Sequence, residues 1–451
     1  MKHIMFFCIP AHGHHNPTFP VVTELIKRGH AVRYYSFDTF REKVEATGAA
    51  YYSCDSFVPE TSKEELRGTP SVTEMTILDL KTTAAMDGFL KEQVEEFKPD
   101  VIVSDSVCFW GKLTARKYHI PLVISTTTFA FNQASASYMK NSFAEIKDLI
   151  CGTKRVKAEL KALEQYGYHE KSVMNLVKND NFTDTIVYAT KKYQPCSETF
   201  SGHYAFVGPS VFSSHPLKKE HKRPLVYISL GTVVNDKPDF YKKCIEALAH
   251  EDMDVIIACG QSVDPSSLNG LSKNVTVSAH VDQLEVLSRA NVFLTHCGMN
   301  SVSESLYMGT PMVFFPQTNE QRAVARRARE MGAGVPLKAE DAESIRSAIL
   351  TVLNNAQYKK AAMDCHHDFH SASGPAGAAD FIEQAPHEMK AQDKKRTKKE
   401  ITTGVLQLVY WILAVFMILW SGRHFSAQTT WGIVIGANLL FPLFKKLLGK
   451  I

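Results

Sequence analysis

The chain has 451 residues, of which 45% are hydrophobic, and a formal net charge of +4. This length predicts two or three domains with full cores, and so small a net charge argues against nucleic-acid binding. The nine cysteines include no Cys-x-x-Cys pair, and Cys8 and Cys259 lie within apolar runs. We therefore expect reduced thiols in a cytosolic protein. We expect no signal peptide, because the first apolar run leads directly into a polar, histidine-rich turn.

The N-terminal residues predict a strand–helix–strand unit. Ile4–Ile9 is an apolar strand, a helix with apolar positions at helical spacing follows, and Ala31–Ser36 is the next strand. Asn16 with Pro17 predicts the start of the helix, as an N-cap followed by proline in the first turn, and Gly29 predicts its end. Such a unit is typical of doubly wound α/β folds, in which catalytic groups lie at the carboxyl ends of the strands.

His14 lies in the turn after the first strand, where a catalytic residue is expected. Because imidazole titrates near neutral pH, His14 is a candidate general base that would take a proton from a hydroxyl group. His12 and His15 are its close neighbours, so a metal site is an alternative, although the turn has no nearby carboxylate or thiolate. A surface histidine without a catalytic role is the other alternative.

Asp105 follows the apolar strand at Val101–Val103 and is expected at the same edge of the sheet as His14. A carboxylate there would hold the imidazole in one tautomer and stabilise its protonated form. The alternative is that Asp105 is the N-cap of a helix expected over Ser106–Tyr118. The residues from 126 to 180 are expected to form mainly helices that wall an acceptor site.

The domain organisation follows from composition and from the positions of the strands. We predict a first domain over residues 1–207, a linker rich in Pro, Ser and charge over 208–224, and a second domain over 225–390. The second domain begins with the apolar strand Leu225–Leu230, so it is expected to be a second doubly wound α/β domain.

A strand–turn–helix pattern in the second domain predicts a phosphate site. Asn291–Thr295 is a short apolar strand, Ser301–Met308 a helix, and the turn His296–Asn300 between them contains a glycine. Such a turn directs backbone N–H groups and the positive end of the helix dipole at one point. Glu320 and Gln321 then supply a carboxylate and an amide suited to sugar hydroxyls. The stretch therefore predicts a nucleotide-sugar site.

Local structure offers an alternative for the same residues, because Ser301 and Glu304 fit a capping box and His296 fits a cap on the strand end. The ordered combination favours the binding site. The pattern H-C-G-x-N-S-x-x-E, followed by G-x-P and a final E-Q, resembles the nucleotide-binding signature of family 1 UDP-glycosyltransferases. The most similar branch is the bacterial macrolide-type branch, and the resemblance extends over about Met1–Ala385.

The resemblance implies a GT-B fold, in which two doubly wound α/β domains face each other across the active site. It implies inverting transfer of a hexose from a UDP-sugar to a hydroxyl of a small hydrophobic or lipid-like acceptor, without a metal or other cofactor. The expected hexose is glucose. The motif P-A-x-G-H-x-N-P assigns His14 as the base, and the motif P-D-x-I-x-x-D assigns Asp105 as its partner.

The resemblance also assigns the donor site, with one departure. His280 stands where the family has Trp or Tyr and Asp282 where it has Pro, so weaker stacking on uracil is expected. In the family, the equivalents of these residues hold the base, the ribose, the diphosphate and the sugar. The implied donor-binding residues are Ser229, Gly231, Thr232, His280, Val281, Gln283, His296, Gly298, Asn300, Ser301, Glu304, Glu320 and Gln321.

Two other functions remain open at this point. A UDP-sugar epimerase shares the two-domain fold but has no need of a His14–Asp105 pair beside an acceptor. A non-catalytic nucleotide-sugar-binding protein would keep His296 and Glu304 and dispense with His14.

Two further patterns resemble metal sites. Asp252-x-Asp254 resembles the metal–diphosphate motif of a different glycosyltransferase fold, but it precedes a strand at its amino end, so we predict a polar loop. The run Cys365–His370 has ligand types that point to several faces at helical spacing, so we predict solvated surface.

The C-terminal residues predict a membrane anchor. Residues 391–400 are a basic linker, and 401–451 predict a transmembrane hairpin. Ile401–Gly422 has no charged residue and is long enough to span a bilayer, and Phe425–Phe444 is a weaker second run. Lysines outside both runs predict that both ends lie in the cytosol, which would place the enzyme at the cytoplasmic face of the cell membrane with lipids as partners. A packed amphipathic or oligomerising helix pair is the alternative.

Overall fold

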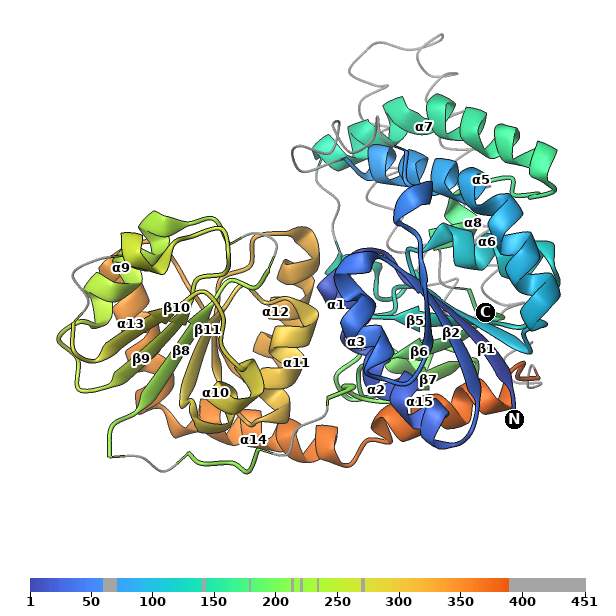
Figure 1. Cartoon of the computed structure of the whole chain (residues 1–451). Helices are drawn as coiled ribbons and strands as arrows, with labels where there is room; N and C mark the ends of the chain where they lie inside the picture. Colours follow the sequence, from blue (N-terminus) through green and yellow to red (C-terminus); the bar gives the residue numbers. More distant parts are fainter. Residues whose placement is uncertain are drawn as a thin grey trace, which may run out of the picture. The chain divides into compact units, whose positions relative to one another are not determined.

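The computed structural model describes residues 1–59, 71–139, 143–177, 180–211, 215–219, 222–232, 235–268 and 272–388. These residues contain two β-sheets, of seven and six strands, and all neighbouring strands are parallel. Both sheets belong to one compact unit, Met1–Phe200 with Tyr204–His387, and helices flank each sheet (Figure 1). The predicted class, two doubly wound α/β domains, is confirmed.

The first sheet has the strand order β3-β2-β1-β4-β5-β6-β7. Phe7 at the end of β1 pairs with Ser104, so the next residue of β4, Asp105, lies at the carboxyl edge beside the end of β1. The strands are β1 (His3–Phe7), β2 (Ala31–Ser36), β3 (Ala50–Ser53), β4 (Val101–Asp105), β5 (Leu122–Thr126), β6 (Asp184–Val187) and β7 (Tyr204–Phe206).

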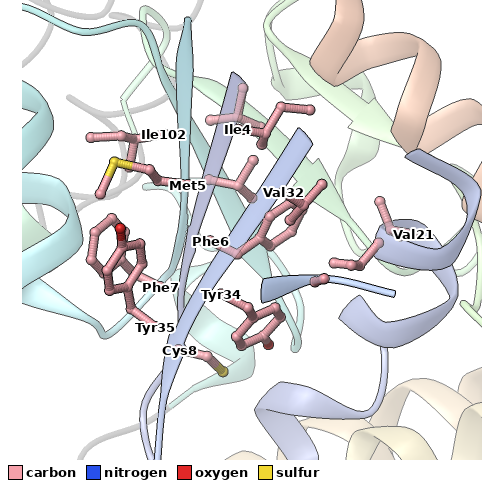
Figure 2. Close-up of a cluster of buried hydrophobic side chains, with 14 of the residues drawn as sticks. Ile4, Met5, Phe6, Phe7, Cys8, Val21, Val32, Tyr34, Tyr35 and Ile102 are labelled. Carbon is pink, nitrogen blue, oxygen red and sulfur yellow. The ribbon is translucent and has the colours of Figure 1, made fainter. Parts of the chain in front are cut away.

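The core of the first domain is built on β1, whose side chains alternate between the two faces of the sheet. Figure 2 shows Phe7 beside Tyr35 on one face and Phe6 beside Tyr34 on the other. The ring centroids are 4.6 Å apart in the first pair and 5.7 Å apart in the second. Because both faces of β1 are buried, it is an apolar run without polar alternation, as expected for a central parallel strand.

The helices of the first domain include a layer that lies apart from this core. Leu80 of α5, Phe109 of α6, Leu160 of α7 and Leu176 of α8 belong to one small apolar cluster, and α7 lies against α5 (Figure 1). The helices are α1 (His12–His15), α2 (Thr18–Lys27), α3 (Arg41–Glu45), α5 (Val72–Phe97), α6 (Phe109–Lys117), α7 (Phe143–Leu163) and α8 (Met174–Val177).

The second sheet has the order β10-β9-β8-β11-β12-β13. Its strands are β8 (Leu225–Ser229), β9 (Asp254–Ala258), β10 (Val275–Ser278), β11 (Val292–Thr295), β12 (Met312–Phe314) and β13 (Gly334–Pro336). Its helices are α9 (Pro238–Leu248), α10 (Gln283–Arg289), α11 (Met299–Tyr307), α12 (Asn319–Glu330), α13 (Ala342–Asn354) and α14 (Ala356–His370), and α15 (Gly374–Gln384) follows. Separate buried clusters cover its two faces, one with α9 and α13 and the other with α10, α11, α12 and α14.

The predicted start of the first long helix is wrong. Asn16 has helical dihedral angles (φ −50°, ψ −45°) and ends the short helix α1, and Pro17 is the N-cap of α2 without a side-chain hydrogen bond. The Thr18 hydroxyl donates to the carbonyl of His15 at 2.8 Å instead. The turn after β1 is therefore helical, which the Asn-Pro signal did not indicate.

The predicted end of the second domain also differs from the structure. Ala378 and Ile382 of α15 lie in the buried cluster of the first sheet. Arg28 of α2 pairs with Asp380 at 2.6 Å and with Glu383 at 3.1 Å. The chain thus returns to the first domain after α14, although the prediction assigned 225–390 to the second.

The run Cys365–His370 is only partly solvated surface: His367 and His370 are exposed, but other members are buried, which corrects that prediction in part. Cys365 is 1% exposed and Phe369 3% exposed. The His366 Nδ1–H and the His370 Nε2–H both donate to the carbonyl of Tyr307, at 2.5 and 3.2 Å. The two imidazoles therefore satisfy a carbonyl at the carboxyl end of α11, a common role for histidine at a helix terminus.

The acidic pair at the start of β9 forms ion pairs, and Asp254 is the first residue of that strand. Arg223 contacts Asp252 at 3.0 Å and Asp254 at 3.3 Å. Across the described ranges, no group of three or more His, Cys, Asp or Glu side chains is placed to hold a metal ion. No helix in the same ranges is long and apolar enough to cross a membrane. The predicted linker at 391–400 and hairpin at 401–451 lie outside the described residues.

Candidate active site

His14 and Asp105 form a hydrogen-bonded pair at the carboxyl edge of the first sheet. His14 is in α1, directly after β1, and its Nδ1 lies 2.6 Å from Asp105 Oδ2. The other carboxylate oxygen accepts the Val107 N–H at 2.9 Å, and the alternative role of Asp105 as a helix N-cap is wrong because α6 begins at Phe109 with Cys108 as its cap. Since a carboxylate only accepts, His14 Nδ1 carries a hydrogen. In the neutral ring, Nε2 therefore carries the lone pair.

The surroundings of His14 favour its protonated form. Burial alone would lower the pKa of His14, but the charge and hydrogen bond of Asp105, with a smaller effect of Glu320, raise the pKa above its ordinary value. The Thr127 hydroxyl, just beyond β5, lies 3.2 Å from His14 Nδ1. Sequence reasoning missed Thr127, although its place after a strand neighbouring β4 could have indicated it.

The neighbouring histidines are structural. His15 is fully buried, stacks on Phe40 with ring centroids 3.8 Å apart, and its Nε2 lies 2.5 Å from Ser36 Oγ. Burial lowers the pKa of His15 to about 4. His12 contacts the edge of Phe40, at a centroid distance of 4.8 Å. This packing gives both neighbouring histidines contacts within the protein.

His296 lies between two glycine turns of the second domain. A Cβ atom added to Gly231 would lie 2.5 Å from His296 Cε1, and one added to Gly298 would lie 2.5 Å from Nε2. Gly231 has a φ of +76°, and Cys297 has a φ of +67°, which is strained for a residue with a side chain. Burial lowers the pKa of His296 to about 4, so the ring is neutral near pH 7.

The turn after β11 opens directly into α11. The N-cap is Gly298, and the first intrahelical hydrogen bond runs from the Val302 N–H to the Gly298 carbonyl at 3.0 Å. The N–H groups of Met299, Asn300 and Ser301 therefore have no partner within the helix and, with the helix dipole, form an anion site. The backbone of Gly231 is fixed by Asn235, whose Nδ2–H donates to its carbonyl at 2.8 Å. Only the fold brings Asn235 there, and no motif indicated it.

The capping box expected at Ser301 and Glu304 is absent, which corrects that alternative. Ser301 lies inside α11, and the Glu304 carboxylate accepts from Gln283 Nε2 at 2.6 Å. The same amide lies 3.4 Å from Ser301 Oγ. Burial raises the pKa of Glu304 to about 7. The structure thus brings together Gln283, Ser301 and Glu304 as one polar group beside the anion site.

The loop before α10 carries the remaining predicted base-binding residues. His280 is exposed, and Val281 is partly buried against the second core. Asp282, which replaces the family proline, accepts from the Glu285 N–H at 3.1 Å and is the N-cap of α10. His280 acts electrostatically on the pKa of His12, so the loop lies near the turn that carries the proposed base.

The predicted sugar-binding residues begin α12. Thr318 is the N-cap, and Gln321 completes a capping box: its Oε1 accepts the N–H groups of Gln317 at 2.7 Å and Thr318 at 3.1 Å. The Gln321 oxygen is thus occupied, and its amide hydrogens are the groups that can contact a sugar. The exposed Glu320 is close enough to His14 to affect its pKa.

Contacts between the two domains join the halves of the site. Asn300 Nδ2 donates to the carbonyl of Gly13 at 3.1 Å, one residue before His14. Asn319, beside Glu320, donates to Glu145 of α7 at 2.5 Å. A small cavity is lined from both domains, by Asn16, Pro17, Thr127, Tyr188, Pro209, Ser210, Val211, Met299, Asn300, Ser303 and Glu304. A larger cavity of about 530 Å³ lies at the opposite edge of the second sheet and contains none of the predicted site residues.

Comparison with known proteins gives similarity over most of the chain. The family model described as "UDP-glucoronosyl and UDP-glucosyl transferase" matches residues 217–372. NDP-glycosyltransferase YjiC of Bacillus licheniformis is 34% identical over 396 residues, which are 85% of this chain and 97% of the relative. Demethyllactenocin mycarosyltransferase of Streptomyces fradiae is 31% identical, over 85% of this chain and 86% of the relative. The crystal structure of the calicheamicin glycosyltransferase CalG4 matches with a TM-score of 0.73 and 26% identity, over 86% of this chain and 100% of that chain.

Proposed function

The chain belongs to the UDP-glycosyltransferase family and is a glycosyltransferase with a nucleotide-sugar donor, and from this premise we propose the reaction and the roles of the residues. The reaction is inverting transfer of a hexose from a UDP-sugar to a hydroxyl of a small hydrophobic or lipid-like acceptor, and the hexose we propose is glucose. Relatives named for glycosylated antibiotics, such as oleandomycin glycosyltransferase, support the hydrophobic acceptor.

His14 is the proposed general base. Its Nε2 takes the hydroxyl proton as the acceptor oxygen forms a bond to the anomeric carbon. The bond from that carbon to the UDP oxygen breaks, and UDP leaves with the electron pair from the opposite face. Asp105, 2.6 Å from Nδ1, stabilises the imidazolium that forms. The raised pKa of His14 makes its neutral form a better proton acceptor near neutral pH.

The departing diphosphate is stabilised by neutral and dipolar groups. His296 lies between Gly231 and Gly298, the N-cap of α11. In the proposed reaction its neutral ring, the first N–H groups of α11 and the turn at Gly231 and Thr232 donate hydrogen bonds to the diphosphate. We propose that these donors replace a metal ion.

Ribose and sugar binding complete the proposed donor site. Glu304 accepts from the ribose hydroxyls, oriented by the 2.6 Å hydrogen bond from Gln283. Glu320 and the Gln321 amide bind the hexose hydroxyls at the start of α12. His280 and Val281 lie against the base.

One observation carries the proposal. His14, which is hydrogen-bonded to Asp105, directly follows Gly13, and the Gly13 carbonyl accepts a hydrogen bond from Asn300 of α11, the helix at the proposed donor site. The test is incubation with radiolabelled UDP-glucose and a panel of flavonoids, macrolides and membrane lipids. His14→Ala is expected to lower transfer by about 10²–10⁴-fold and to leave UDP binding nearly unchanged. Near-normal turnover would contradict the assignment.

The matched control is His12→Ala in the same turn. A catalytic base requires only His14, whereas a metal site in this turn would lose activity in both variants. Conversion of UDP-glucose to another UDP-sugar without acceptor would favour the epimerase. UDP-sugar binding without any product across the panel would favour a non-catalytic binding protein.

We also propose that residues 401–451 anchor the enzyme at the cytoplasmic face of the cell membrane. The proposal rests on the uncharged run Ile401–Gly422 and the lysines that flank the two apolar runs. Truncation after Lys399 is expected to release active enzyme from the membrane fraction. Full-length chain in the supernatant after alkaline carbonate extraction would contradict the anchor.

A further inference from the structure

The outer face of α7 carries cations and no acidic side chain. Positions three and four residues apart on a helix share a face, and this face is exposed along the length of α7. In order along the helix, the exposed residues are Lys147, Ile150, Cys151, Thr153, Lys154, Arg155, Lys157, Ala158, Lys161 and Ala162. Within the described ranges, none of the five cations has a carboxylate within 4.0 Å, and Arg155 acts on Asp148 only at longer range, where it helps to lower the pKa of that carboxylate.

The acids of α7 are less exposed than the cations, and two of them bond other parts of the protein. Glu145 accepts from Asn319 at 2.5 Å, and Asp148 accepts the Thr73 N–H at 3.0 Å. Glu159 is half-buried. This separation of signs is a property of the folded helix, since acidic and basic residues are mixed along its sequence.

Apolar side chains are exposed among these cations. Ile150 is 69% exposed, within the cationic face. Val72 and Met75 at the start of α5 are 49% and 38% exposed. They lie close to α7, because Thr73 between them bonds Asp148 and packs against Gly152. A face with cations alone would be an ordinary solvated surface, but exposed large aliphatic side chains leave apolar area in water.

We propose that this face of α7, with the start of α5, docks on an anionic membrane surface. Lysine and arginine side chains there attract anionic lipid headgroups, and Ile150, Val72 and Met75 enter the boundary between headgroups and acyl chains. The exposed aliphatic residues favour a membrane over nucleic acid, which would be contacted through phosphates and stacked bases. This inference goes beyond the proposed reaction and does not depend on residues 401–451.

Docking here would act on the half of the site that faces the acceptor. α7 contacts α5 and α6 through Leu160, Phe109 and Leu80, and Glu145 at its start binds Asn319 next to the proposed sugar-binding residues. A membrane under α7 would therefore lie on the first domain, to which a lipophilic acceptor binds in the proposed reaction.

Cys151 offers a reporter in the face itself, because it is the exposed cysteine among the described residues, whereas Cys196 is half-buried and the other seven are buried. In a full-length chain with Cys196→Ser, Cys151 would carry a polarity-sensitive fluorophore. The protein is mixed with phosphatidylcholine vesicles with and without phosphatidylserine. We expect a blue shift only with phosphatidylserine. In the control, Cys151→Ser with Lys360→Cys moves the fluorophore to α14, where no shift is expected.

Charge reversal tests the cations. Lys154→Glu with Lys157→Glu is expected to weaken the response to phosphatidylserine vesicles by at least roughly 30-fold, from the loss of two surface cations. Lys359→Glu with Lys360→Glu makes the same change in net charge on α14 and is expected to have little effect. All four positions are exposed, so melting temperatures are expected to stay close to that of the parent chain.

Several outcomes would overturn the proposal. If the chain cosediments with vesicles while the Cys151 fluorophore stays in water, another segment makes the contact. An equal shift with pure phosphatidylcholine would exclude recognition of anionic lipid. If RNA shifts the fluorophore and vesicles do not, the face is a nucleic-acid surface.

Discussion

Replacing Asp105 by Asn tests the proposed base through both rate and pH. The substitution keeps the size of the side chain and an oxygen that can accept from Val107, but it removes the charge 2.6 Å from His14 Nδ1. A hydrogen bond to a charged group contributes about 1.5–3 kcal/mol. Asp105 is 1% exposed, so solvent does not screen this interaction. Because about 1.4 kcal/mol corresponds to a tenfold change in rate, kcat/KM is expected to fall by about 10- to 150-fold.

The pH dependence gives an independent readout. In the parent enzyme Asp105 raises the pKa of His14, and the base is active only when neutral, so kcat/KM rises with pH through that raised pKa. Without the carboxylate the pKa of His14 falls, and the acidic limb is expected to move to lower pH while the plateau drops. Thr127, 3.2 Å from Nδ1, can still accept its hydrogen and preserve part of the productive tautomer.

The assay is the initial rate of UDP release across the pH range, with calorimetry of UDP-sugar binding and thermal melting in parallel. Donor binding is expected to stay unchanged, since Asp105 does not contact the donor site. An unshifted acidic limb with a normal plateau would refute the pairing as the source of catalysis. A lower plateau with an unshifted limb would mean that Asp105 acts through structure alone.

Other substitutions test the donor site. Glu304→Gln is expected to raise the donor KM several-fold. Burial raises the pKa of Glu304 to about 7, so ionisation of this carboxyl in the folded protein lowers stability. The variant should therefore melt at a higher temperature than the parent above that pH, and at the same temperature at acidic pH. His280→Trp is expected to tighten UDP-sugar binding through a larger stacking surface, and weaker or equal affinity by calorimetry would mean that the base is held elsewhere. Gly298→Ala places a Cβ 2.5 Å from His296 Nε2, and overpacking is expected to cost about 1–3 kcal/mol of stability and, by displacing His296, to weaken donor binding; normal melting and normal affinity would show that the turn relaxes.

The fold, and the edge of the first sheet at which His14 and Asp105 lie, were predictable from the local sequence pattern. Apolar runs without alternation indicate buried parallel strands, and Ala31–Ser36 was predicted with the bounds of β2. The rule that functional groups gather at the carboxyl ends of such strands then placed His14 and Asp105 at one edge. Neither step requires knowledge of side-chain packing. The 2.6 Å contact itself depends on the short helix α1, which the sequence did not indicate.

Helix caps were harder to predict, because several polar residues near a helix start satisfy the same pattern. Ser301 and Glu304 fit a capping box, yet α11 begins earlier, at Met299, since Gly298 allows the chain to enter the helix directly from the turn. Gln321 was predicted as a sugar ligand and also forms the capping box of α12. The choice depends on where the chain leaves the sheet, which is set by tertiary packing.

The sheet on which each late helix packs could not be predicted. α15 returns to the first domain because Arg28 binds Asp380 and Glu383 and because Ala378 and Ile382 complete the first core. An amphipathic helix carries no sign of which sheet it will cover. The same limit applies to α7, where Glu145 and Asp148 bond Asn319 and Thr73 of distant segments.

The two proposed functional histidines show what the structure adds to a motif. Each follows a parallel strand and has a glycine within two residues, so the sequence presents His14 and His296 in similar surroundings. Both are partly buried, and burial lowers the pKa of each, but Asp105 lies against His14 and raises its pKa, whereas His296 lies between two glycine turns and its pKa falls to about 4. When their surroundings shift the pKa values of two identical side chains in opposite directions, the two side chains can take different chemical roles. His14 can therefore gain a proton during the proposed reaction, while His296 stays neutral and donates a hydrogen bond to the leaving group.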